Sequence, residues 1–285
     1  MKVVLLGPDG QLGYDVRKAH EEAGAPFELL PVGRDRLDVT APDLEERLAE
    51  MSFDVLLNCT GYHRTDDVED NAGLAVKVNA HAVQGMARAC ARRRARLLHI
   101  STDYVFGGDT QRRTPLREDD PVAPVNVYGA SKLLGETLAQ LSWEDVVVVR
   151  VASLFGVAGA DSKGGNFVET MLRLARERGQ LRVVEDQVMS PTATTDVAGV
   201  LMRMLLDECP AGTYHAVNGG EASWYDFARE IVRQSTVLAK VTPCASDEFR
   251  ARAARPGYSA LDNAKVSRAF GALAPWQDAL GRYLA

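Results

Sequence analysis

The chain has 285 residues, which is enough for one large domain or for a domain with a smaller lobe. Hydrophobic residues make up 46% of it and charged residues 25%, values typical of globular proteins, so disordered and fibrous classes are excluded. The formal net charge is −6, and this sign argues against nucleic acid as the main partner, because a polyanion-binding surface is normally basic.

The sequence also lacks the signals of a membrane span, a disulfide framework or a metal site. No stretch approaches the roughly 18 uninterrupted apolar residues of a membrane helix, and the N-terminal apolar run leads into a glycine-rich turn without a cleavage site. The four cysteines show no C-x-x-C spacing and the five histidines no H-E-x-x-H motif. We therefore expect no metal, no membrane partner and a reducing, cytoplasmic location.

Short β-branched segments alternate with helical patterns in the first half of the chain. The strands are predicted at 3–6, 27–32, 54–58, 96–100 and 146–151, and the helices at 12–23, 42–51, 71–93 and 129–141. Strands with so little polar alternation are typical of a parallel sheet that is buried on both faces. The alternation predicts a doubly wound α/β sheet, with residues 1–150 as a dinucleotide-binding domain.

The pattern becomes less regular after about residue 150. Helices are predicted at 167–178, at 195–208 and after an N-cap at Ser223, and strands at 181–184 and 213–217. We expect residues 151–285 to complete the sheet and to form a smaller lobe for the substrate.

A glycine-rich loop, residues 7–13 (GPDGQLG), joins the first predicted strand to the first helix. Glycines there permit a tight turn and let the backbone approach a pyrophosphate, to which the helix N-terminus offers free N–H groups. The spacing is G-x-x-G-x-x-G, and glycines in such loops can also serve only to turn the chain. The position on the first strand–helix turn nevertheless favours dinucleotide binding.

The residues after the second predicted strand bear on the choice of cofactor. A carboxylate there accepts hydrogen bonds from the adenosine ribose and favours NAD, whereas an arginine can pair with the 2′-phosphate of NADP. This chain has both, because Arg34 and Asp35 follow Gly33. Arg34 comes first, so we expect NADPH as the cofactor, with NADH as the alternative. It also stays open that Arg34 is merely exposed and has no binding role.

Two tyrosine–lysine pairs have Y-x-x-x-K spacing, Tyr14–Lys18 and Tyr128–Lys132. Residues four apart share a helix face, and an ammonium near a phenol favours the phenolate, which suits a proton donor at neutral pH. Only Tyr128 lies beyond the fourth predicted strand, whose end carries Thr102, and carboxyl ends of parallel strands border the ligand crevice. We predict that Thr102 and Tyr128 converge on a carbonyl oxygen and that Tyr14 is structural.

With these elements in place, the chain resembles the extended short-chain dehydrogenases/reductases, and more narrowly the dTDP-4-dehydrorhamnose reductase family. The resemblance covers nearly the whole chain and rests on 7–13, 101–106 (STDYVF), 124–132 (PVNVYGASK), 135–136, 165–167 (GNF), 186–187, 191–192, 223–225 (SWY) and 255–256. It implies a Rossmann-like fold and the transfer of hydride from NAD(P)H to the 4-keto group of a nucleotide-linked 6-deoxyhexose.

The resemblance also implies roles for matched residues. Tyr128 would be the proton donor and Lys132 its partner and a ribose ligand, while Thr102 would polarise the keto oxygen. The substrate residues would be Thr102, Asp103, Ser153 and Arg255. With Arg34 from the strand argument, the expected cofactor residues are Gly7, Gly10, Gln11, Leu12, Gly13, Arg34, Asp38, Val39, Gly61, Tyr62, His63, Tyr128 and Lys132.

Three segments depart from the family pattern, and all three belong to the expected sugar side. Ser153 stands where the family usually has a tryptophan against the sugar. Residues 58–63 read NCTGYH where small alanines and a threonine are usual, and residues 161–164 look like an insertion. The hexose, the nucleotide, a magnesium requirement and the oligomeric state, for which a homodimer is one option, therefore stay open.

Two other functions also stay open. A sugar-nucleotide epimerase or dehydratase of the same superfamily would recycle a tightly held NAD, although dehydratases commonly add an Asp-Glu pair where this chain has Asp103 and Tyr104. A non-catalytic NADP-binding regulatory subunit would keep the fold, but the complete set of Thr102, Tyr128 and Lys132 favours an enzyme.

Overall fold

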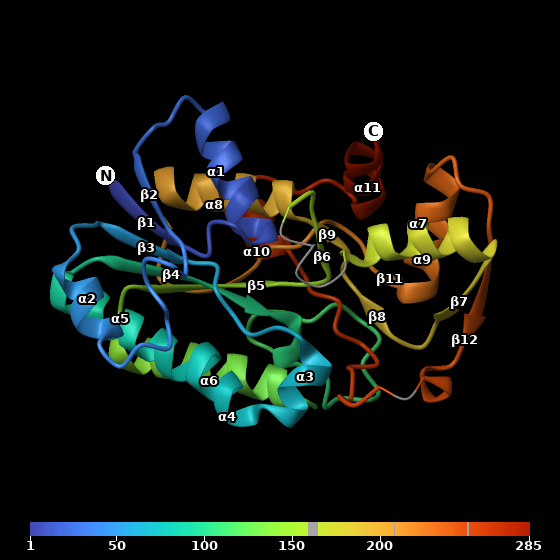
Figure 1. Ribbon diagram of the computed structural model, residues 1–285, viewed down its shortest axis with the longest axis horizontal. Coiled ribbons are helices and arrows are strands. Elements are labelled where there is room, and N and C mark those ends of the chain that lie inside the picture. Colours follow the sequence, from blue (N-terminus) through green and yellow to red (C-terminus); the bar gives the residue numbers. More distant parts are fainter. Residues whose placement is uncertain (159–164, 208, 250) are drawn as a thin grey trace.

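The computed structural model describes residues 1–158, 165–207, 209–249 and 251–285, and it is built around a six-stranded parallel sheet (Figure 1). The strand order is β10-β5-β4-β3-β1-β2. The strands are β1 (Lys2–Leu6), β2 (Glu28–Val32), β3 (Val55–Asn58), β4 (Arg96–Thr102), β5 (Val146–Val151) and β10 (Gly212–His215). From β1 the chain first moves outward to β2 and then returns past β1 to β3, so the sheet is doubly wound as the sequence predicts.

Helices cover both faces of this sheet (Figure 1). One face carries α1 (Gln11–Glu22), α8 (Thr194–Leu206) and α10 (Ala264–Phe270), and the other carries α2 (Leu44–Glu50), α5 (Ala82–Arg93) and α6 (Val127–Ser142). Successive strand residues point to opposite faces. Val3 and Leu5 of β1 therefore join the core under α1 and α8, whereas Val4 and Leu6 join the core under α2 and α5.

The second half of the chain adds a smaller lobe at one end of the sheet (Figure 1). A third core, which includes Phe155, Phe227 and Trp276, holds this lobe together. Its elements are β6 (Leu154–Phe155), α7 (Phe167–Arg178), β7 (Gln180–Val184), β8 (Val188–Met189), β9 (Thr192–Ala193), β11 (Ala222–Ser223), α9 (Trp224–Gln234), β12 (Lys240–Cys244) and α11 (Trp276–Leu284). Strand β10 and helix α8 also come from this half, but they belong to the main sheet and its cover.

The helical stretch predicted near 71–93 is confirmed, but it is not a single regular α-helix. The segment contains α4 (Ala72–Val76), a π-helix over Lys77–His81 and then α5, and a further helix, α3 (Thr65–Asp70), precedes it. The wider π turn carries Asn79, whose side chain bonds the backbone of Tyr62 and the hydroxyl of Ser131. Single π turns inside α-helices are frequent at functional sites.

The strand that carries the site is longer than predicted. It continues beyond residue 100 because Ser101 and Thr102 pair with Arg150 and Val151 of β5. The strand predicted over 213–217 instead ends at His215. The suggested insertion at 161–164 lies outside the described residues.

Candidate active site

The glycine loop has the form that a dinucleotide needs, and its three glycines serve different purposes. Gly7 has a φ of +76°, and a Cβ on Gly13 would lie 2.0 Å from the Gly7 carbonyl oxygen, so the turn itself requires both. A Cβ on Gly10 would meet only the Gly7 oxygen, at an ordinary 3.5 Å. The fold therefore does not require glycine at residue 10, whereas the close approach of a pyrophosphate would.

The N-terminus of α1 supports the same assignment. Gly10 is its N-cap residue and has no side chain that could satisfy the first N–H groups of the helix. The Oε1 atom of Gln11 is buried and has no hydrogen-bond partner among the described residues. An anion at the helix end and a hydroxyl donor beside Gln11 would satisfy these groups, so the loop fits NADPH.

Arg34 lies beyond β2 with 86% of its side chain exposed. Its guanidinium is 3.4 Å from the carboxylate of Asp38. Asp38 in turn accepts hydrogen bonds from the backbone N–H and the hydroxyl of Thr40, and these bonds hold the pKa of the Asp38 carboxyl below its usual value. Val39, next in the chain, is half-buried. The exposed Arg34 side chain can therefore reach a 2′-phosphate, but to do so it would have to break its ion pair with Asp38.

The segment after β3 lies against the predicted lysine. A Cβ on Gly61 would come within 3.9 Å of Lys132 Nζ. The side chain of Asn79 holds the next residue, because it accepts from the backbone N–H of Tyr62 at 2.8 Å and donates to its carbonyl at 2.9 Å. His63 turns its Nδ1 toward the Gly61 carbonyl, 3.1 Å away.

Thr102 and Tyr128 lie near each other. Thr102 is the last residue of β4 and Tyr128 stands in the first turn of α6, and the nearby Thr102 hydroxyl acts to lower the pKa of the phenol. Burial acts more strongly in the other direction, and with the charge of Asp103 it raises the pKa of Tyr128 to about 12. The phenol is therefore protonated at neutral pH and available as a proton donor.

Lys132 lies one helical turn further along α6 and is almost fully buried. Its Nζ donates to the carbonyl of Ile100 at 2.7 Å and lies 3.3 Å from His99 Nε2. Neither of these two contacts is with the Tyr128 phenol. Burial lowers the pKa of Lys132 to about 8, although Glu136 and Cys59 act to raise it. The prediction that this ammonium lowers the phenol pKa is therefore wrong for this structure, because burial raises the pKa of Tyr128 instead.

Asp103 is buried under Thr102. Its carboxylate accepts from the hydroxyl of Ser259 at 2.6 Å and from that of Thr102 at 3.2 Å. Burial raises the pKa of Asp103 to about 6. In this arrangement the carboxylate orients Thr102 and ties β4 to the second half of the chain, a role that differs from the expected contact with the sugar.

The two other predicted substrate residues come from different segments. Arg255 pairs with Asp66 at 3.0 Å, and its charge offsets part of the rise that burial and Asp103 cause in the pKa of Tyr104. The Tyr104 ring in turn meets the Tyr128 ring edge-on, with centroids 5.8 Å apart. Ser153 is half-buried and has a φ of +41°, a left-handed conformation that is uncommon outside glycine and concentrates at functional sites.

The motif search missed a buried polar network behind Lys132. Arg150 of β5 forms an ion pair with Glu136 at 2.7 Å, and Ser101 donates to the same carboxylate. On the other side of Lys132, His99 contacts Asn58 of β3. Neighbouring strands bring these residues together, and no local spacing in the sequence indicates it.

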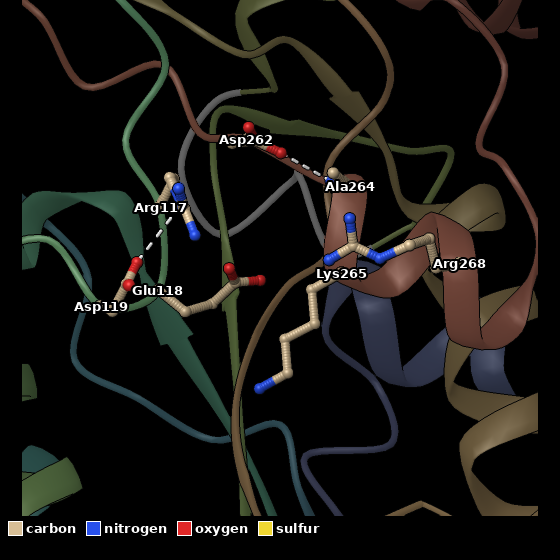
Figure 2. Close-up of a pocket in the computed structure, with 7 residues that line it drawn as sticks. All are labelled: Arg117, Glu118, Asp119, Asp262, Ala264, Lys265 and Arg268. Carbon is tan, nitrogen blue, oxygen red and sulfur yellow. Dashed lines mark hydrogen bonds and ion pairs between the residues drawn. The ribbon is translucent and has the colours of Figure 1, made fainter.

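A separate charged hollow of about 500 Å³ lies beside α10 (Figure 2). Side chains from a loop and from α10 surround it, and none of them is a predicted site residue. Its lining consists of Arg117, Glu118, Asp119, Asp262, Ala264, Lys265 and Arg268.

The doubly wound sheet, the glycine loop, and Thr102 at the end of β4 with Tyr128 and Lys132 on α6 define a dinucleotide-dependent oxidoreductase of the short-chain dehydrogenase/reductase class. The chain belongs to the family described as RmlD substrate binding domain, whose model matches residues 1–285.

Three related proteins illustrate the match. A dTDP-4-dehydrorhamnose reductase of Mycolicibacterium smegmatis is 37% identical over 98% of this chain and 84% of its own length. A probable dTDP-4,6-dihydroxy-2-methyloxan-3-one 4-ketoreductase of Streptomyces antibioticus is 35% identical over 98% and 93%. The crystal structure of the Bacillus anthracis dTDP-4-dehydrorhamnose reductase in complex with NADP has a TM-score of 0.90 at 33% identity and covers 99% of this chain and 98% of its own.

Membrane-spanning helices and metal-binding clusters are both absent from the described residues. None of the helices there is long and apolar enough to cross a membrane. No group of three or more His, Cys, Asp or Glu side chains in this part of the chain could hold a metal ion.

Proposed function

We propose that this protein reduces the 4-keto group of a dTDP-linked 6-deoxyhexose with NADPH, dTDP-4-dehydrorhamnose being the first candidate. Membership of the family supports the reduction of a 4-keto sugar, and so do the two relatives, a dTDP-4-dehydrorhamnose reductase and a probable 4-ketoreductase. The observation that carries the proposal is the convergence of Thr102 and a protonated Tyr128 at the end of β4, with Lys132 one turn away.

The residues around the glycine loop would hold the cofactor. The N–H groups at the start of α1 would bind the pyrophosphate, and Gly10 leaves room for it. Arg34 would bind the 2′-phosphate after exchanging its contact with Asp38. Gly61, which borders Lys132, and Tyr62, which Asn79 holds, would lie beside the nicotinamide ribose. When bound, NADPH supplies the hydride that goes to C4 of the sugar.

Tyr128 and Thr102 would act on the keto oxygen. Thr102 donates a hydrogen bond that polarises the carbonyl, and Tyr128 transfers its phenolic proton to the oxygen as C4 is reduced. The keto group thereby becomes a hydroxyl and Tyr128 a phenolate. The Thr102 hydroxyl, which donates to Asp103 in this structure, would turn to the keto oxygen, and Lys132 in its charged form would bind the ribose and through it stabilise the phenolate.

The sugar side would be formed by the second half of the chain, residues 151–285, with residues 1–150 as the dinucleotide domain. Arg255 can approach the sugar nucleotide from beside Tyr104, and Ser153 leaves space where a tryptophan would cover the sugar. A cytoplasmic location accords with four free cysteines and with the use of NADPH.

A panel of nucleotide-linked 4-keto-6-deoxyhexoses tests the proposal, with loss of NADPH absorbance as the readout. We expect steady oxidation of one NADPH per sugar with at least one dTDP-linked member. A protein purified with stoichiometric NAD that consumes no NADPH would point to an epimerase or dehydratase, and a protein that binds NADPH without turning over any keto sugar would point to a regulatory subunit.

A further inference from the structure

Two buried residues form a polar chain to Lys132 that the proposed proton transfer does not use. Asn58 and His99 are both 0% exposed and face each other as register partners on β3 and β4. Asn58 Nδ2 lies 3.0 Å from His99 Nδ1, and His99 Nε2 lies 3.3 Å from Lys132 Nζ. Each polar atom in these two contacts can be assigned as a donor or an acceptor.

Thr60 fixes the orientation of the Asn58 amide. The backbone N–H of Thr60 donates to Asn58 Oδ1 at 3.0 Å, and the Thr60 hydroxyl donates to the same atom at 2.6 Å. If the amide were turned over, its NH₂ group would face the backbone N–H of Thr60, and two donors would oppose each other. Asn58 Nδ2 therefore donates to His99, and His99 Nδ1 is the acceptor.

This assignment determines the tautomer of His99. Burial and the neighbouring Lys132 hold the pKa of His99 well below its usual value, so the ring is neutral at physiological pH. A neutral imidazole carries one proton, and because Nδ1 accepts, that proton is on Nε2. The Nε2–H group is directed at Lys132 Nζ. A neutral amine can accept this hydrogen bond, whereas an ammonium has no lone pair with which to do so.

We propose that Asn58 and His99 are a positioning pair for Lys132: Asn58 selects the Nε2–H tautomer of His99, and this N–H opposes protonation of the lysine. The inference rests on the role of Lys132 in the proposed reduction. It means that the pair sets the alkaline limit of activity, because the lysine must carry its proton to stabilise the phenolate.

The other groups around Lys132 do not have this effect. Glu136 on the same helix favours the ammonium, as does Cys59 after β3. Arg150 forms an ion pair with Glu136 and so offsets part of its charge. The Ile100 carbonyl accepts from Nζ in both protonation states. Burial lowers the pKa of Lys132 to about 8 against the opposing effects of Glu136 and Cys59. The His99 N–H would act in the same direction as burial.

The first test is the tautomer of His99 in the free wild-type protein, which is independent of any activity. Long-range ¹H–¹⁵N NMR of ¹⁵N-histidine-labelled protein distinguishes the two tautomers, and only five histidines need assignment. We expect a protonated Nε2 and an unprotonated Nδ1 that do not titrate between pH 6 and 9. An Nδ1–H tautomer, or titration of the ring in this range, would overturn the proposal.

The second test is the direction in which Lys132 titrates after His99→Phe, which keeps a planar aromatic ring and removes both nitrogens. We expect the Lys132 pKa, followed through its ¹³Cε resonance and assigned with Lys132→Arg, to rise by roughly half a unit to one unit, less than a full charge would cause. The alkaline limb of kcat/KM should move up with it. A fall, or no change, would mean that His99 accepts from an ammonium or only fills space.

His20→Gln is the matched control, because it also removes a buried histidine, but one on α1 that contacts Phe27. It should leave the Lys132 pKa unchanged. If no keto sugar is reduced, the proposed function fails while the tautomer and the Lys132 pKa still decide whether the pair acts as described.

Discussion

At the scale of single residues, burial decides the chemistry of the site. Tyr128 is kept protonated because burial raises the pKa of its phenol to about 12, and Lys132 is brought to a pKa of about 8 by the same cause. A reductase needs a phenol that gives its proton only when negative charge develops on the substrate oxygen. The environment of Tyr128 suits that requirement.

Replacing Tyr128 by phenylalanine removes this proton donor. General acid catalysis contributes about 10²- to 10⁴-fold, so kcat should fall by that factor while NADPH binding, followed by fluorescence titration, is retained. Tyr14→Phe is the control, because Tyr14 is 39% exposed on α1, and it should change little. A Tyr128→Phe variant that keeps more than about a tenth of kcat would rule out this role.

Arg34 is expected to select NADPH over NADH. A charge-assisted contact with the 2′-phosphate is worth about 1.5–3 kcal/mol, or roughly 10- to 100-fold in the ratio of kcat/KM values. Arg34→Ala should reduce the ratio by this factor, and steady-state kinetics with both cofactors measure it. An unchanged ratio would instead assign the adenosine ribose to Asp35 or Asp38.

Ser153 is expected to limit the fit of the rhamnose precursor. An aromatic ring against the sugar adds about 0.5–1.5 kcal/mol, so Ser153→Trp should raise kcat/KM for dTDP-4-dehydrorhamnose about two- to tenfold. The left-handed φ of +41° opposes a bulky residue, and thermal unfolding should be measured beside the kinetics. If a folded variant gains nothing, Tyr62 or His63 covers the sugar or the serine has no bearing on substrate choice.

At the scale of elements, the order of the strands along the chain explains which site residues could be brought together from the sequence alone. Thr102 and Tyr128 could be brought together because strand ends in a parallel sheet meet at one edge. The pairing of Asn58 with His99 needed the register of β3 and β4, and the bond from Ser259 to Asp103 joins residues 156 apart. No local pattern indicates contacts of this kind. Helix periodicity also predicts where a helix lies, but it does not predict a π turn inside that helix.

The glycine loop offers a test at this scale. Gly10→Ala should leave stability within about 0.5 kcal/mol, because its Cβ would meet only an ordinary contact, yet it should weaken NADPH binding. Gly13→Ala should destabilise the protein by about 1–3 kcal/mol or more, because its Cβ would collide with the Gly7 carbonyl. Urea unfolding and NADPH titration measure the two effects. Equal binding of NADPH by wild type and Gly10→Ala would contradict the assignment of the loop.

At the scale of the whole molecule, the two halves of the chain share one sheet. His215 at the sheet edge comes from the second half and pairs with Arg150 of β5. It is fully buried, and burial with the Arg150 charge lowers its pKa to about 3. Between about pH 6.5 and 3 the unfolded chain binds a proton at this residue and the folded protein does not, so stability is lost as the pH falls.

This loss can be isolated by comparison with His215→Gln. From pH 7 to pH 5 the wild type should lose about 2 kcal/mol of unfolding free energy relative to the variant, because one buried histidine contributes about 1.4 kcal/mol per pH unit below 6.5. Urea unfolding of both proteins at the two pH values measures it. A constant difference would mean that His215 accepts a proton in the folded state.

The central claim is that hydride passes from NADPH to C4 of the sugar, and isotope transfer tests it most directly. Dideuterated NADPH, labelled at both C4 positions of the nicotinamide, is incubated with the protein and dTDP-4-dehydrorhamnose, and the sugar product is analysed by NMR and mass spectrometry. The account predicts one deuterium at C4 of the hexose for each NADP⁺ formed, and a transfer rate lower by about 10²- to 10⁴-fold with Tyr128→Phe. A product without deuterium at C4, or a sugar interconverted with no net oxidation of NADPH, would contradict it.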